Sequence, residues 1–282
     1  MKESKMFQSA VVAAAVFCLL AGAAMAQSAP AQPPAQPGEA APPAATIPLA
    51  KQPAVKSQAE GDAVVAMLQA AQGPDPDARI TACQNLINKF PNSEFKPLAL
   101  FFMTMSFQEK NDYEKTIAYG ELTLKEDPEN IQTLLLLSRL IASRTRENDL
   151  DKEEKLKTAE KYATHAVEAT KTSPRPNPSV TDEQWIDARK EMLAQAYEAF
   201  AMIAMARENT EAAIEQFKKA IETSPGDPAT MVRLGNALAK AGKYDEAIST
   251  FERVMAIPDA PQQVKQIAQA ERVRAVQAKS GK

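Results

Sequence analysis

Two stretches near the C-terminal end of this 282-residue chain repeat one residue pattern. The first has Ala213, Phe217 and Ala220, and the second has Ala247, Phe251 and Val254, each offset by 34 residues. Within each stretch, spacings of four and three residues place the side chains on one face of a helix. A period of this length indicates a stacked array of helix pairs, because each pair has an apolar face that only a neighbouring pair can cover.

The residues between the two stretches add a second signature. Leu234-Gly235 lies on the first helix of the later unit, Gly242 lies in its turn, and Pro225 and Pro258 close the two units. Together these features resemble the tetratricopeptide repeat family. The resemblance covers most of residues 60 to 258, and an earlier unit departs from the pattern at Gly120 and Thr123, where Ala or an aromatic residue is usual.

This resemblance implies an all-α fold, namely a right-handed superhelical array of antiparallel helix pairs (an α-solenoid) with a C-terminal capping helix. An apolar content of 45% with only 9 glycines fits such a fold. The helical repeat domain is expected over residues 58–282. Its units are expected at about 58–91, 97–130, 131–174, 181–227 and 228–258, with a capping helix over 261–279.

Two of these units exceed the period. In the unit over 131–174, the polar run Arg144 to Asp151 predicts a turn with about nine additional residues relative to a 34-residue repeat. In the next unit, Thr181 with Gln184 predicts a capping box that begins a long helix, which runs through Trp185 to about Arg207. Trp185 is expected to cover the edge of the preceding unit, with contact to a ligand as the alternative.

The N-terminal residues predict export. Residues 1–26 have the pattern of a signal peptide, with Lys2 and Lys5 before an apolar run and Ala24-Met25-Ala26 as the cleavage signal. Residues 27–57 contain eight prolines and are expected to form a disordered Pro/Ala/Gln-rich tether. A Pro-rich ligand for a partner domain is the alternative interpretation of the tether. We therefore expect a periplasmic or secreted protein with no membrane span after signal cleavage.

The chemistry of the chain favours binding over catalysis. His165 is its only histidine and Cys83 its only cysteine after signal cleavage, so a His/Cys metal cluster is excluded. Cys83 shares a helical face with apolar residues, which predicts a buried, inert thiol. No Gly-x-Gly phosphate loop occurs, and a formal net charge of −3 does not suggest nucleic acid. We expect no catalytic residue, no cofactor and no metal.

Members of the family usually bind partner segments along the face formed by the first helix of each unit. By resemblance, we assign thirteen residues of this chain to that face: Leu98, Phe101, Met105, Gln108, Leu135, Arg139, Gln195, Glu198, Met202, Met205, Val232, Asn236 and Lys240. The apolar members are suited either to contact with a partner or to packing between units, and the pattern does not separate these roles. Asn236 with Lys240 resembles clamps for peptide carboxylates in some family members, for which Arg139 is a further cationic candidate.

The resulting hypothesis is a non-catalytic scaffold or adaptor in the cell envelope, which binds a protein partner and self-associates weakly or not at all. One alternative is a subunit of an outer-membrane or envelope assembly complex. An alternative of another class is a helical repeat enzyme acting on envelope carbohydrate, which would need two carboxylates facing a common pocket.

Overall fold

The computed structural model describes residues 47–225 and 227–281. The predicted signal peptide, and the predicted tether up to residue 46, lie outside these residues. The described residues divide into two compact units: a small one formed by 47–54 together with 173–187, and a large one formed by 55–172, 188–225 and 227–281.

The described residues form eleven helices, which confirms the all-α prediction. In chain order they are α2 (Gln58–Gln72), α3 (Pro76–Lys89), α4 (Lys96–Glu109), α5 (Tyr113–Glu126), α6 (Ile131–Arg144), α7 (Lys152–Thr172), α8 (Asp182–Ala206), α9 (Thr210–Thr223), α10 (Pro228–Lys240), α11 (Tyr244–Ala256) and α12 (Gln262–Lys279).

The helices begin where the sequence supplies a cap. The side chains of Asp75, Asp112, Asn130, Asn209 and Asp227 each accept a hydrogen bond from a backbone N–H in the first turn of α3, α5, α6, α9 and α10. These N–H groups have no partner inside the helix, so a short polar side chain before the helix stabilises its start.

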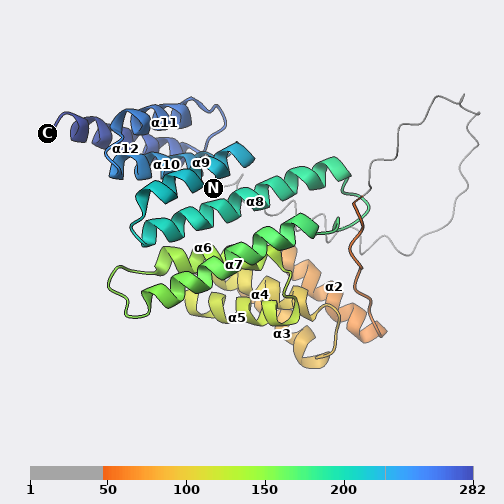
Figure 1. Ribbon diagram of the computed structural model, residues 1–282. Helices are drawn as coiled ribbons and strands as arrows, with labels where there is room; N and C mark the ends of the chain where they lie inside the picture. The colour runs from red at the N-terminus through yellow and green to blue at the C-terminus, as the bar shows by residue number, and fades with distance from the viewer. Residues whose placement is uncertain (1–46, 226, 282) are drawn as a thin grey trace, which may run out of the picture. The chain divides into compact units, whose positions relative to one another are not determined.

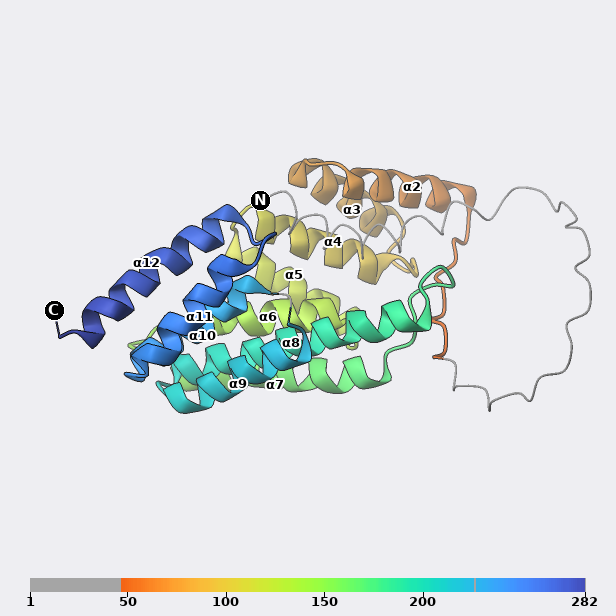
Figure 2. The same cartoon turned by 90° about the horizontal axis from the view of Figure 1, so that it is seen from above.

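Within the large unit, consecutive helices pack as pairs, and the pairs pack on one another. Helix α4 contacts α5, α6 contacts α7, and α10 contacts α11, while α3–α4, α5–α6 and α11–α12 connect successive pairs. Figure 1 and Figure 2 both show α10, α11 and α12 side by side, with α12 following the last pair. This is the arrangement expected when each pair covers the apolar face of the previous one.

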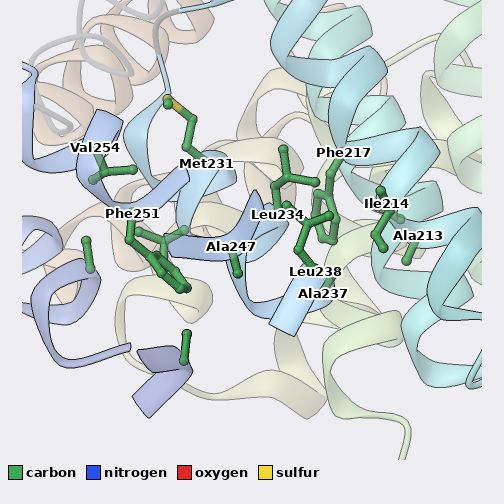
Figure 3. Close-up of a cluster of buried hydrophobic side chains, with 14 residues drawn as sticks. Ala213, Ile214, Phe217, Met231, Leu234, Ala237, Leu238, Ala247, Phe251 and Val254 are labelled. Carbon is green, nitrogen blue, oxygen red and sulfur yellow. The ribbon is translucent and has the colours of Figure 1, made fainter. Parts of the chain in front are cut away.

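The repeated residues of the sequence form the core of the C-terminal pairs. Phe217 is 2% exposed and Phe251 is fully buried, in one cluster with Leu234, Leu238 and Ala247. Figure 3 shows this cluster between α9, α10 and α11. Gly235 faces Phe251 so closely that a Cβ atom at residue 235 would overlap the ring. The Leu-Gly signature therefore exists because only glycine lets the ring of the second helix approach the first.

The turns inside the pairs use a left-handed residue. Asn111 (φ 57°), Glu208 (φ 64°) and Gly242 (φ 75°) each follow the first helix of a pair. Glycine adopts this conformation without steric cost, and asparagine tolerates it, whereas glutamate is disfavoured there. Glu208 is therefore a strained position in a turn that otherwise follows the repeat.

The additional residues of the unit over 131–174 are distributed differently from the prediction. The turn contains only residues 145–151, and the rest of the insertion lengthens α7, which has 21 residues against 14 in α5. The first turns of α7 are stabilised by Lys155, whose Nζ lies 3.0 Å from Asp149 and 2.9 Å from Asp151. Residues 145–151 thus form the turn where the polar run predicts it, and the i,i+4 pair of Asp151 with Lys155 supports the start of α7.

The small unit confirms one expectation and differs from another. The capping box at the start of α8 is present: Thr181 Oγ1 accepts from the Gln184 N–H at 3.2 Å, and Gln184 Oε1 accepts from the Thr181 N–H at 3.0 Å. The end of the expected tether, however, is not an unstructured chain, since Leu49 forms a parallel β-bridge with Arg175. Trp185 is 8% exposed, and its Nε1–H donates to the Ser173 carbonyl at 3.1 Å. Contact with a ligand is therefore not favoured for this tryptophan.

Candidate partner-binding face

The thirteen residues assigned to the binding face lie on α4, α6, α8 and α10, the first helices of four successive pairs. We call this surface of the large unit the first-helix face. Leu98 through Gln108 come from α4, Leu135 and Arg139 from α6, Gln195 through Met205 from α8, and Val232 through Lys240 from α10. Their exposure differs greatly, and it separates residues that can meet a partner from residues that hold the helices together.

Three of the seven large apolar members of the set are core residues. Leu135 is fully buried, Val232 is 7% exposed and Phe101 is 9% exposed. Met202 packs against the core of α9–α11 and also against the core of α6 and α7, and Met205 packs against the former. Packing between helices therefore accounts for the three buried residues. Met202 and Met205 pack against the core and are also partly exposed, as are Leu98, Met105, Gln108 and Gln195.

A charged link joins three of the four helices. The carboxylate of Glu198 on α8 has a side chain only 6% exposed, and it lies 3.4 Å from Arg139 Nη1 of α6. On its other side, Glu198 accepts a hydrogen bond from Arg233 Nη1 of α10. One buried carboxylate is thus shared by two arginines from neighbouring units, and burial of such a charge requires this pairing.

The arginines of this link reach the surface. The Arg139 side chain is 30% exposed and that of Arg233 is 44% exposed. Since each guanidinium has five N–H groups, both keep donors available beyond those that contact Glu198. Sequence reasoning found Arg139 and Glu198 but missed Arg233.

The missed residue belongs to an exposed polar stripe on α10. Arg233, Asn236 and Lys240 are all exposed, and their spacing of three and four residues places them on one face of the helix. That spacing from the two predicted residues, Asn236 and Lys240, was the signal that could have identified Arg233. The stripe presents two cations and an amide, and with Arg139 and Glu198 the polar part of the face carries a net positive charge.

This arrangement suits recognition by hydrogen bonding. Guanidinium and ammonium groups donate to carboxylates and to carbonyl oxygens, and arginine does so with a defined planar geometry. The one carboxylate present, Glu198, is held between two arginines. It has no second carboxylate opposite it among the thirteen assigned residues. The face can therefore bind acceptor groups of a partner, and it does not present the pair of acids that glycoside hydrolysis requires.

The other candidate reactive residues are explained by their surroundings. His165 Nε2 lies 2.9 Å from Glu129 Oε1 on a partly exposed surface of the large unit. Cys83 is fully buried, and burial raises the pKa of its thiol to about 12, with Arg79 opposing the shift. Within residues 47–225 and 227–281, no three His, Cys, Asp or Glu side chains are grouped so as to hold a metal ion. Among the described helices, none combines the length and the apolar character needed to cross a bilayer.

Comparison with known proteins identifies one stretch of the chain that matches a family model. Residues 204–271 match the family model of the tetratricopeptide repeat. This match contains α9, α10 and α11, the helices that carry the repeated pattern. None of the curated proteins compared with the chain matches its sequence.

Solved structures resemble most of the chain. MamA of Desulfovibrio magneticus RS-1, from residue 41 to its end, is 14% identical, with a TM-score of 0.55 over 74% of this chain and 99% of MamA. PilW, described as a type IV pilus biogenesis factor, is 12% identical, with a TM-score of 0.54 over 80% of this chain and 95% of PilW. A thermophilic TPR protein of Thermus thermophilus, TTC0263, is 14% identical, with a TM-score of 0.52 over 77% of this chain and 98% of that protein.

At such identities the structural likeness establishes the fold alone. The family match, the packed helix pairs and the buried Leu-Gly and Phe positions agree with one another. The chain is therefore a helical repeat protein, of which residues 204–271 match the family model of the tetratricopeptide repeat.

Proposed function

We propose that this protein is a non-catalytic scaffold of the cell envelope, which binds a protein partner on the polar part of the first-helix face. The tetratricopeptide-type fold supports a role in protein–protein interaction, since its stacked pairs create extended binding surfaces. The observation that carries the proposal is the position of Arg139, Glu198 and Arg233, which brings three successive units into one charged surface.

The charge of this surface defines the chemistry of the partner. Arg139, Arg233 and Lys240 provide three cations against the single carboxylate of Glu198. Asn236 adds an amide that can pair with the main chain of a bound segment. A partner segment with acidic side chains or a free carboxylate would complement these groups. A purely apolar segment would leave them without partners and so would bind less tightly.

An envelope location rests on the predicted signal peptide, which is a feature of residues 1–26 alone. A role as a subunit of an envelope assembly is the second candidate. PilW, a protein of similar fold, is described as a type IV pilus biogenesis factor, and the pilF protein of Pseudomonas aeruginosa also has a similar fold. Because both are 12% identical to this chain, they support its fold and do not identify an assembly.

The test is a crosslinking pull-down from the envelope fraction with the full-length protein. The variant Asn236→Glu with Lys240→Glu reverses the charge of the exposed stripe without changing a buried residue. Its matched control is Ser249→Glu with Arg253→Glu, which makes equivalent changes at the same spacing on exposed positions of α11. Variants at Phe101 or Met202 are unsuitable because Phe101 is buried and Met202 packs against two core clusters.

We expect the wild type and the α11 control to capture the same partner, and the α10 variant to lose it while its circular dichroism and melting temperature stay unchanged. Capture of that partner by all three proteins would refute binding at the first-helix face. Loss from both variants would show a general effect of added negative charge, which also contradicts the proposal. A full-length protein found only in the cytoplasm would refute the envelope location.

A further inference from the structure

The small unit contains a segment of extended chain bound in a defined way. The Arg175 N–H donates to the Pro48 carbonyl at 2.7 Å, and the Ala50 N–H donates to the Arg175 carbonyl at 2.7 Å. These two bonds form the parallel bridge between Leu49 and Arg175. Residues far apart in the sequence thus pair through an isolated bridge, whereas the regular elements of the described residues are helices.

Side chains fix this pairing at both ends. The Arg175 Nε–H donates to the Ile47 carbonyl at 3.3 Å, and its Nη1 donates to the Val180 carbonyl at 2.9 Å. The Arg175 guanidinium also lies 3.0 Å from Asp182, the first residue of α8. From the other strand, Gln52 Nε2 donates to the Pro176 carbonyl at 2.7 Å. Arg175 is therefore held by the start of α8 while it holds residues 47–50.

The residues around Arg175 restrict pairing to one edge. In an extended strand, the N–H and C=O of one residue point to one side, and those of its neighbours point to the other. Arg175 directs both groups to residues 48–50. Its neighbours are Pro174 and Pro176, which have no N–H to offer on the opposite edge. The segment can thus accept one strand and does not serve as a template for a second.

We propose that residues 174–176, with the side chain of Arg175, form a binding site for an extended peptide, and that the chain's own residues 47–52 occupy it. The site recognises a carbonyl, an N–H two residues later and a glutamine two residues after that, as supplied by Pro48, Ala50 and Gln52. Main-chain bonds of this kind provide affinity, and side-chain contacts provide selectivity.

This site gives the Pro-rich N-terminal segment a defined point of attachment. Pro48 already fixes an extended backbone, so little conformational entropy is lost when residues 47–52 bind. The inference is independent of the first-helix face, because none of the thirteen assigned residues belongs to the small unit. Its failure would leave the proposed function unaffected.

The experiment uses hydrogen exchange of the full-length protein. Ala50→Pro removes the N–H that donates to Arg175, so the strand should dissociate. Leu49→Pro is the matched control, because the bridge uses the N–H of Ala50 and the C=O of Pro48 and no main-chain group of Leu49. We expect the Arg175 amide to exchange about tenfold faster in Ala50→Pro, as loss of one or two hydrogen bonds implies, and to stay protected in Leu49→Pro.

A second measurement tests the site in trans. A labelled peptide of residues 46–54 should bind saturably to the full-length Ala50→Pro protein, whose site is vacant, and at least about tenfold more weakly to the wild type, whose site is filled. The same peptide with Pro in place of Ala50 should bind neither protein. Equal exchange of the Arg175 amide in the wild type and in Ala50→Pro would overturn the proposal. So would a peptide that fails to bind the vacant site.

Discussion

Replacement of Gly235 by alanine tests whether the Leu-Gly signature reflects contact with Phe251. A Cβ atom at residue 235 would lie 2.6 Å from Phe251 Cζ and 2.9 Å from Cδ1, whereas carbon atoms pack at about 3.5–4.0 Å. Since Phe251 is fully buried, the ring or the helix must move by about 1 Å. Such overpacking costs about 1–3 kcal/mol, and here the upper part of that range applies because a rigid ring is the obstacle.

The same substitution also has a favourable effect, since alanine is preferred over glycine inside a helix by about 1 kcal/mol. The expected net result is a loss of about 2 kcal/mol in the free energy of unfolding, measured by urea denaturation of the full-length protein. Gly61→Ala is the control, because the nearest atom to its added Cβ is Val55 Cγ2 at 4.0 Å. It should stabilise α2 by about 0.5–1 kcal/mol.

A second variant tests whether the destabilisation by Gly235→Ala arises from contact with the Phe251 ring. Phe251→Leu alone should destabilise the core, but in combination with Gly235→Ala its cost should fall, because the added methyl group occupies space that the ring has left. A Gly235→Ala protein as stable as the wild type would refute the reasoning, and so would strictly additive effects of the two substitutions.

Four further outcomes are expected. Glu208→Gly should stabilise the protein by about 1 kcal/mol in urea denaturation, because it relieves a left-handed turn residue (φ 64°). Glu198→Gln should lower the free energy of unfolding by about 2 kcal/mol, since charge-assisted hydrogen bonds to two arginines are weakened. Glu252→Gln, on the exposed surface of α11, is the control and should change the free energy of unfolding little. The Cys83 thiol should resist thiol reagents at pH 8 until the protein unfolds. Its pKa is raised from 9.0 to about 12 in the folded protein. The neutral thiol therefore contributes to the free energy of unfolding fully below pH 9, and this contribution is lost as the pH rises towards 12. Truncation after Pro258 should lower the melting temperature and promote aggregation, because α12 covers Phe251 and its neighbours through Ala268 and Ala275; an unchanged melting temperature would contradict this role.

The helices and their core could be predicted from the sequence because the signals are local. The spacing of Ala247 and Phe251 on one helical face, and the capping box of Thr181 with Gln184, each involve residues within one turn or two. The period of 34 residues then implies stacking, since a single helix pair cannot bury its apolar face. The division of the inserted residues between the turn and α7 was not predictable in the same way, because this boundary depends on ion pairs of Lys155 with Asp149 and Asp151 and not on an apolar pattern.

The candidate site was predictable only in part. The helical period identified which residues lie on the first helices, but their exposure depends on how neighbouring units approach. Phe101 and Leu135 were equally suited to a groove and to a core, and only the packed structure shows that they are buried. The helical spacing could have placed Arg233 beside Asn236 and Lys240, but its pairing with Glu198, 35 residues earlier, is decided by the tertiary structure.

The sequence by itself therefore determined the helical repeat, its caps and its closing helix, since each depends on residues close together in the chain. Tertiary structure decided which of the candidate residues reach the surface, how Glu198 is shared by two arginines and where residues 47–52 bind. Those contacts join residues from 35 to 128 positions apart. The contacts of Glu198 depend on the stacking of successive helix pairs, and the pairing of residues 47–52 forms within the small unit, so no local sequence pattern connects these residues.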